Sequence, residues 1–178
     1  MEWMILPLKK YFQFSGRSRR KEYWMWILFL IIVSIVLMIL DSLLGLGGRS
    51  AFSTAPAGAG SAGLSAFTSG GILTNIFTLA TFIPGLAVSV RRLHDVNRSG
   101  WWILAVFVPY LIGFTLLLGG AFGGGGALLL VGGIAMLLGL LAGILLLVWM
   151  CTNGTNGPNR FGDDPKGDSA EQLAETFS

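Results

Sequence analysis

The sequence of 178 residues has few charged side chains, one cysteine and one histidine. Charged residues make up 12% of the chain, about half of the roughly 25% found in soluble domains, and the mean hydropathy is +0.72. A soluble domain of this length would need far more polar surface, so the composition indicates a polytopic membrane protein. The single cysteine, Cys151, excludes an intramolecular disulfide.

Motifs for catalysis and for nucleotide binding are also missing. No Gly-x-Ser-x-Gly, Walker or His-Glu-x-x-His pattern occurs, and the glycine run at 123–126 lacks the Gly-Lys-Ser/Thr ending. One histidine and one cysteine make a zinc site weak. His94 and Asp95 are adjacent, so on a helix they point about 100° apart and form no direct dyad, although His94 could act with Glu22 or Asp164. We therefore expect no enzyme activity and no cofactor, and a structural role for His94.

Apolar runs are the main feature that the sequence does contain. About 20 residues are needed to cross a bilayer, and four runs supply them: 23–46, 72–90, 101–122 and 127–150. A three-span reading would merge 101–150 into one helix, which at about 1.5 Å per residue is far too long for a core of about 30 Å. The sequence predicts an all-α membrane protein with four transmembrane helices, preceded by a short interfacial segment at 1–14.

Residues 1–165 are expected to form a single polytopic membrane domain. Within it, 47–71 is rich in Gly, Ala and Ser and reads as a flexible external loop, and the acidic tail at 166–178 reads as disordered. Asp41 and Asn75 come near the same ends of the first two spans, so we expect these two side chains to contact each other and join the helices there.

The distribution of basic residues predicts the orientation. With both termini in the cytoplasm, the outer side holds only Arg49. The inner side holds the other eleven basic residues: Lys9, Lys10, Arg17, Arg19, Arg20, Lys21, Arg91, Arg92, Arg98, Arg160 and Lys166. The positive-inside rule favours this arrangement, and all six tryptophans fall near the same interface. The basic cluster at 9–21 abuts a span, so we expect it to meet anionic lipids of the cytoplasmic leaflet rather than nucleic acid.

Several short blocks in order along the chain carry a family resemblance. They are Phe14-Ser-Gly-Arg17, Arg20-Lys-Glu-Tyr-Trp24, Arg91-Arg-Leu-His-Asp95, Ser99-Gly-Trp-Trp102, Gly157-Pro-Asn-Arg-Phe-Gly162 and Asp164-Pro165. Over roughly residues 1–166 the chain resembles the bacterial inner-membrane family catalogued as domain of unknown function 805. The resemblance implies a location in the inner membrane and brings no established activity.

The stretch Arg91–Trp102 is expected to be a short cytoplasmic loop on which the other polar segments converge. The candidate residues of this rim are Arg17, Arg20, Glu22, Arg91, Arg92, His94, Asp95, Arg98, Trp101, Trp102, Asn159, Arg160 and Asp164.

Two hypotheses for the rim remain open besides the enzyme. In the first, the rim is a structural and interaction surface. Glu22 then pairs with an arginine of the loop, and the Gly- and Asn-rich segment at 153–165 folds back against Trp101 and Trp102. In the second, it binds an anionic lipid headgroup or a phosphorylated small molecule, with transport as an extended form. The helix N-terminus at Ser99-Gly100 would then offer N–H groups to the anion. No protein partner can be named.

Overall fold

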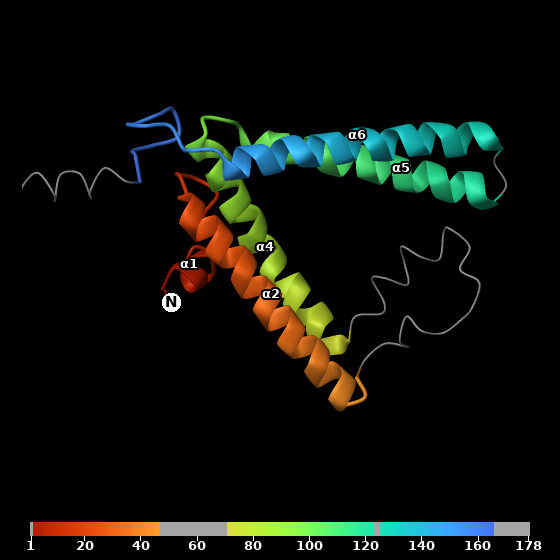
Figure 1. Cartoon of the computed structure of the whole chain (residues 1–178), viewed down its shortest axis with the longest axis horizontal. Helices are drawn as coiled ribbons and strands as arrows, with labels where there is room; N and C mark the ends of the chain where they lie inside the picture. The colour runs from red at the N-terminus through yellow and green to blue at the C-terminus, as the bar shows by residue number, and fades with distance from the viewer. Residues whose placement is uncertain (1, 47–70, 123–124, 166–178) are drawn as a thin grey trace, which may run out of the picture. The chain divides into compact units, whose positions relative to one another are not determined.

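A computed structural model describes residues 2–46, 71–122 and 125–165. Its helices, labelled in Figure 1, are α1 (Glu2–Lys9), α2 (Arg20–Leu43), α4 (Ile72–Asp95), the short 3₁₀ helix η1 (Gly100–Ile103), α5 (Leu104–Phe122) and α6 (Gly126–Cys151). The expected external loop, except for Gly71, and the expected disordered tail lie outside the described residues.

The prediction of an all-α membrane protein with four spans is confirmed. Four helices are long and apolar enough to cross a membrane: Arg20–Leu43, Ile72–Asp95, Gly100–Ala121 and Gly126–Cys151. Each agrees with one predicted run, with ends that differ by up to five residues. The described residues contain no strand, only an isolated bridge between Asn159 and Gly162.

The expectation that Arg91–Trp102 is a loop is wrong at both ends, because α4 continues through Asp95 and η1 begins at Gly100, which leaves only residues 96–99 outside helices. The helix ends in a Schellman motif, in which Arg98 N donates to Leu93 O at 2.8 Å and Asn97 N donates to His94 O at 3.0 Å. Asn97 is left-handed, with φ of 57°, a conformation that asparagine tolerates at this cap position. The charged side chains of the last helical turns are therefore held in fixed directions.

The chain forms two compact units. The first unit comprises Met1–Phe29, Thr81–Ile103 and Ile144–Ser178, and the second comprises Leu30–Ala80 and Leu104–Gly143. All six tryptophans and every described lysine and arginine belong to the first unit. Every candidate rim residue therefore lies in one unit.

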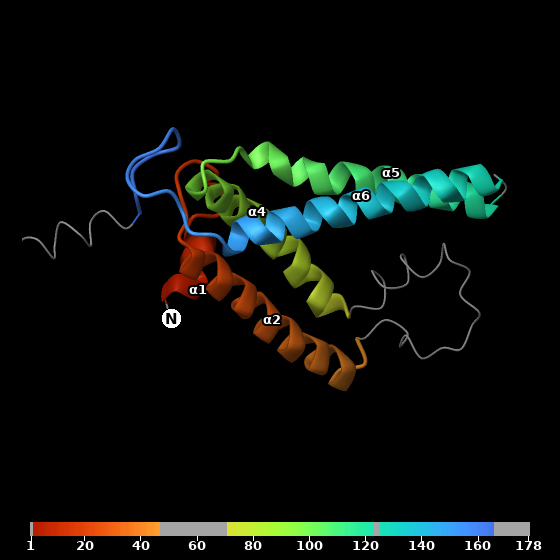
Figure 2. The ribbon, with the colours of Figure 1, turned by 45° about the horizontal axis from the view of Figure 1, so that its top comes forward.

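In the first unit, α2 and α4 lie side by side and antiparallel (Figures 1 and 2). Ser18 N, just before α2, donates to Arg91 O near the end of α4 at 3.1 Å. Two turns further along α2, Trp26 is fully buried and its Nε1 lies 3.6 Å from where a Cβ on Gly85 would be. The indole therefore lies against α4, at a distance where a Cβ on residue 85 would make an ordinary van der Waals contact with it.

In the second unit, the side chain of Asp41, near the end of α2, caps the start of α4. Its carboxylate accepts hydrogen bonds from Leu73 N at 3.0 Å, from Thr74 N at 2.9 Å and from the Thr74 hydroxyl at 2.8 Å. A carboxylate on the first N–H groups of a helix satisfies donors that have no partner within the helix. Asp41 thus joins the two helices at this end, but its described bonds go to Leu73 and Thr74, and the expected contact with Asn75 is not among them.

Helices α5 and α6 form a close antiparallel hairpin in the second unit (Figures 1 and 2). A Cβ on Gly132 would lie 3.1 Å from Gly113 O and 3.0 Å from Leu117 Cγ, and one on Gly139 would lie 3.1 Å from the Tyr110 ring. Small residues at such positions let two helix backbones approach closely in a membrane, where packing rather than the hydrophobic effect drives association.

Candidate functional site

The last turns of α4 carry Arg91, Arg92, His94 and Asp95, in the first unit. Successive side chains on a helix point in different directions, so each of the four meets different neighbours. The side chains of Arg91 and Arg92 are only 1% and 0% exposed. A buried guanidinium is costly unless acids and hydrogen-bond acceptors surround it, and the neighbouring segments supply both.

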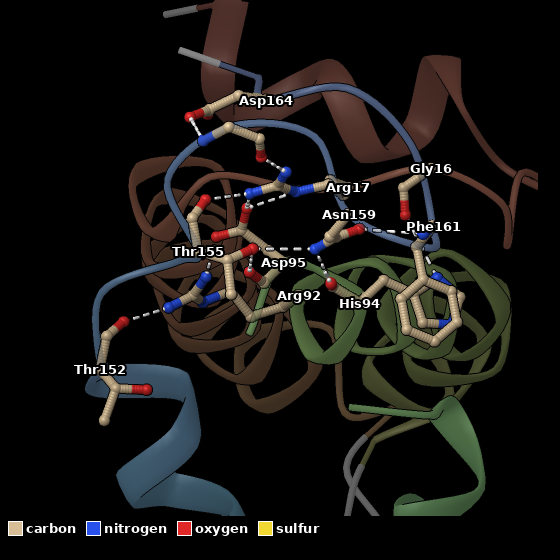
Figure 3. Close-up of polar contacts among 11 residues, drawn as sticks. Gly16, Arg17, Arg92, His94, Asp95, Thr152, Thr155, Asn159, Phe161 and Asp164 are labelled. Atoms are coloured by element: carbon tan, nitrogen blue, oxygen red, sulfur yellow. Dashed lines mark hydrogen bonds and ion pairs between the residues drawn. The ribbon is translucent and has the colours of Figure 1, made fainter. Parts of the chain in front are cut away.

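Asp95 is the acid at the centre of this site (Figure 3). Arg17 Nε donates to Asp95 Oδ1 at 3.0 Å, and Arg17 Nη2 lies 3.0 Å from the same oxygen. Arg92 Nη1 donates to the other oxygen, Oδ2. The Asp95 side chain is 6% exposed and that of Arg17 is 1% exposed. Two buried guanidiniums therefore share one carboxylate, which leaves one positive charge to be stabilised by other acceptors.

The C-terminal segment, residues 152–165 after α6, supplies the acceptors for Arg17 through its backbone carbonyls. Its Nη1 donates to Gly157 O and its Nη2 donates to Thr155 O, both at 2.6 Å. Thr155 N and its hydroxyl donate in turn to the Asp95 carbonyl, at 2.9 and 3.2 Å. The segment is thus bonded to both members of the Arg17–Asp95 pair.

The C-terminus of α6 supplies the acceptors for Arg92. Arg92 Nε donates to Met150 O at 3.3 Å, and Nη2 donates to Thr152 O. Arg20 adds a hydrogen bond from Nη1 to Cys151 O at 3.0 Å. The last carbonyls of a helix have no partner within it and carry partial negative charge, so this helix end suits a pair of arginines.

Hydrogen bonds within the C-terminal segment and to α4 fix the conformation of this segment. Asn159 Nδ2 donates to the His94 carbonyl at 3.0 Å and to the Thr155 hydroxyl at 2.9 Å. Gly157 N donates to Asp164 Oδ2 at 2.9 Å. Gly157 has φ of 76°, in the left-handed region where glycine carries no steric cost. The segment is therefore a defined turn, which the side chains of Asn159 and Asp164 stabilise by hydrogen bonds.

His94, near the end of α4, contacts this turn through its ring. Its ring stacks on that of Phe161, with centroids 3.9 Å apart and planes 3° from parallel. Its Nδ1 lies 3.2 Å from the Gly16 carbonyl, which as an acceptor selects the tautomer that carries a proton on Nδ1. His94 therefore links the α4 end to the segment before α2 and to the C-terminal segment at once.

Glu22 and Arg91 form a second, separate ion pair. Arg91 Nη1 lies 3.1 Å from Glu22 Oε1, and the two side chains are 1% and 4% exposed. Neither Nη atom of Arg91 has a hydrogen-bond acceptor among the described residues, and the one described hydrogen bond of this guanidinium is from Nε to Ala87 O at 3.4 Å. The expected pairing of Glu22 with an arginine of this region is present in the structure.

The remaining cations of the rim lie over aromatic rings instead of beside acids. Arg98 Cζ is 4.9 Å from the centroid of Trp149, which meets Trp102 edge to face at 5.0 Å. Arg160 Cζ is 4.6 Å from the ring of Phe161, and its Nη2 donates to Asn97 O at 3.2 Å. These are cation–π contacts, which need no counter-charge.

A family model described as "Protein of unknown function (DUF805)" matches residues 11–163. The chain belongs to this family. It is 36% identical over 166 residues to inner membrane protein YhaI of Escherichia coli K12, covering 93% of this chain and 97% of the relative. It is also 36% identical over 169 residues to inner membrane protein YhaH of the same strain, covering 93% of this chain and 98% of the relative. No solved structure matches.

This DUF805 protein is thus a multi-pass protein of the bacterial inner membrane, from a family without an assigned activity. Within residues 2–46, 71–122 and 125–165, no group of three or more His, Cys, Asp and Glu side chains could hold a metal ion. The absence of a cofactor and of enzyme activity stays a prediction.

Twelve of the thirteen candidate residues have a side chain with a described polar, ionic or ring contact in the first unit, and the exception is Trp101. Trp101 is 77% exposed, so the C-terminal segment does not cover it, and Trp102 packs on Trp149 of α6. The expectation that the segment at 153–165 folds back against Trp101 and Trp102 is therefore wrong. The segment reaches Asp95 and His94 instead, because their carbonyls and the two nearby guanidiniums offer it hydrogen bonds.

Sequence reasoning missed the residues that contribute backbone atoms. Thr152, Thr155 and Gly157 accept arginine hydrogen bonds through carbonyls, which any residue type could supply. Gly154 was missed as well, although a Cβ there would lie 2.1 Å from Asp95 Oδ2. The repeated Asn-Gly pattern at 153–157 indicated a turn, and its glycines were the available signal for a close backbone approach.

Proposed function

We propose that this DUF805 protein is a structural and interaction module of the inner membrane, with both termini in the cytoplasm. In this proposal its cytoplasmic rim is closed by a clamp, which we define as Arg17, Arg92 and Asp95 with the carbonyls of 150–157. The observation that carries the proposal is the sharing of one buried carboxylate by Arg17 and Arg92. Each of these arginines is bonded to the C-terminal segment as well.

The burial of the clamp argues against a ligand pocket at the same arginines. A guanidinium that binds an anionic ligand needs donors that face an accessible space. Arg17 already donates to Asp95, Gly157 and Thr155 with a side chain 1% exposed. Arg92 donates to Asp95, Met150 and Thr152 with a side chain 0% exposed. In this proposal the clamp therefore joins α4, the segment before α2 and the C-terminal segment, and it binds no ligand.

Limited proteolysis tests the clamp. Arg17→Met removes two charge-assisted hydrogen bonds to the C-terminal segment, each worth about 1.5–3 kcal/mol. Trypsin cleavage after Arg160, measured on the full-length protein in detergent, is expected to accelerate at least about tenfold, since cleavage follows the population of the open form.

Arg98→Met is the matched control, because Arg98 also loses its charge but lies over Trp149 without a described bond to the C-terminal segment. Its cleavage rate should stay within about twofold of the wild-type rate. Equal rates for Arg17→Met and the wild type would refute the clamp.

The proposed orientation has an independent test. Eleven basic residues on the inner side against one on the outer side favour cytoplasmic termini. A reporter that is active only in the cytoplasm is expected to be active when fused after Ser178 and inactive when inserted between residues 50 and 70. An inactive reporter after Ser178 would contradict the orientation without bearing on the clamp.

The second candidate function is binding of an anionic lipid headgroup or a phosphorylated small molecule at the rim. Arg98 favours it, because this arginine lies over Trp149 and forms no ion pair with a described acid. Its donors are therefore open to a phosphate, unlike those of Arg17 and Arg92.

A further inference from the structure

The indole of Trp3, on α1, is shared by two cations that flank the start of α2. The Cζ atom of Arg19 lies 5.8 Å from the ring centroid, and Nζ of Lys21 lies 5.6 Å from it. Both views place α1 next to the first turns of α2 (Figures 1 and 2). None of these three residues belongs to the clamp.

The two charges have no acid to balance them among the described residues. The three ion pairs described involve other arginines, and Glu2, the acid next to Trp3 in the sequence, pairs with neither Arg19 nor Lys21. Two like charges around one ring repel each other, although the face of the ring attracts each of them. An anion that contacts both cations would offset this repulsion.

The surroundings of Trp3 suit a membrane surface better than an aqueous one. Ile5 on the same short helix is 45% exposed, and Phe12 just after it is 73% exposed. Apolar side chains exposed beside basic ones are typical of segments that lie at the boundary between headgroups and acyl chains. Tryptophan is enriched at the same depth. An anion that reaches Arg19 and Lys21 there is the phosphate of a lipid.

We propose that Trp3, Arg19 and Lys21 form a binding site for the phosphate of an anionic phospholipid. The guanidinium of Arg19 donates hydrogen bonds to the phosphate oxygens, and the ammonium of Lys21 contributes a point charge. The Trp3 ring holds both cations in place and contacts the glycerol and upper acyl region. The site goes beyond the clamp and is independent of it, since it uses exposed and half-exposed cations where the clamp uses buried ones.

Native mass spectrometry of the full-length protein in detergent tests this site. The probes are phosphatidylglycerol and, as the neutral counterpart, phosphatidylcholine with the same acyl chains. Arg19→Gln with Lys21→Gln is expected to weaken phosphatidylglycerol binding about 30-fold, because the charge-assisted contacts of both cations with the phosphate are lost. Phosphatidylcholine binding should not change.

The matched control is Lys9→Gln with Lys10→Gln, which removes the same charge from the same segment without touching the Trp3 ring. It should weaken phosphatidylglycerol binding by less than about threefold. Trp3→Leu should give an intermediate loss with both cations still present. Arg98→Gln, measured in the same spectra, reports on the second candidate function separately.

Several outcomes would overturn the site. An equal loss in both double variants would mean a diffuse attraction by net charge, and no loss in either would mean that these cations bind no lipid. Displacement of the lipid by millimolar inorganic phosphate would identify a site for free phosphate. A change of oligomeric state in Arg19→Gln with Lys21→Gln, at unchanged lipid binding, would identify a protein interface. Unchanged melting temperatures of the variants would show that the clamp is intact in each case.

Discussion

Asp95→Asn is expected to lower the free energy of unfolding by about 3–5 kcal/mol, the usual cost of removing one partner from a buried ion pair. The amide keeps the shape of the side chain but removes the only acid among the described residues that is bonded to Arg17 and Arg92. Two guanidiniums with side chains 1% and 0% exposed then lack a counter-charge. The measurement is unfolding of the full-length protein in detergent, followed by tryptophan fluorescence, and a fall in melting temperature of at least about 6 °C is expected.

Asp163→Asn is the control for this variant. It makes the same chemical change in the same unit, at a side chain that is exposed. Its melting temperature should stay within about 2 °C of the wild-type value, since surface substitutions usually have small effects. If Asp95→Asn and Asp163→Asn had the same melting temperature, the carbonyls of the C-terminal segment would be sufficient to stabilise both arginines. Asp95 would then not be the centre of the clamp.

The membrane architecture could be predicted from the sequence because it depends on local composition. A run of about 20 apolar residues has few alternatives to a spanning helix. The four helices accordingly match the four apolar runs. Basic residues and tryptophans avoid the membrane core, so their grouping in one unit could also be anticipated from their positions along the chain. The family resemblance rested on the same charged blocks, and the match over residues 11–163 confirms it.

The direction of each rim side chain could not be predicted in this way. A polar run between two spans reads as a loop, yet Arg91–Asp95 is helical because partners from distant segments bury its charges. The pairing of Glu22 with an arginine was accessible from charge alone. The bonds of Arg17 to Gly157 and Thr155 were not, because their acceptors are backbone atoms without a sequence signal.

Glu22→Gln is expected to lower the free energy of unfolding by about 3 kcal/mol, because it leaves the Arg91 guanidinium buried without its acid. Arg91 is 1% exposed, lies 3.1 Å from Glu22 and has no hydrogen-bond acceptor at either Nη atom among the described residues. The hydrogen bond from Arg91 Nε to Ala87 O, at 3.4 Å, would remain, but it supplies no negative charge. Glu2→Gln, at an exposed residue of α1, is the control with the same chemical change and should leave the melting temperature unchanged.

The double variant Glu22→Leu with Arg91→Met separates charge compensation from attraction between the helices. It removes both charges and keeps similar volumes, a replacement that is often neutral or stabilising because two desolvation penalties disappear together. We therefore expect it to recover the stability lost in Glu22→Gln to within about 1 kcal/mol of the wild type. A double variant as unstable as Glu22→Gln would mean that the pair itself holds α2 against α4. Recovery would mean that apolar packing around Trp26 and Gly85 joins these helices, and that Glu22 is there to neutralise Arg91.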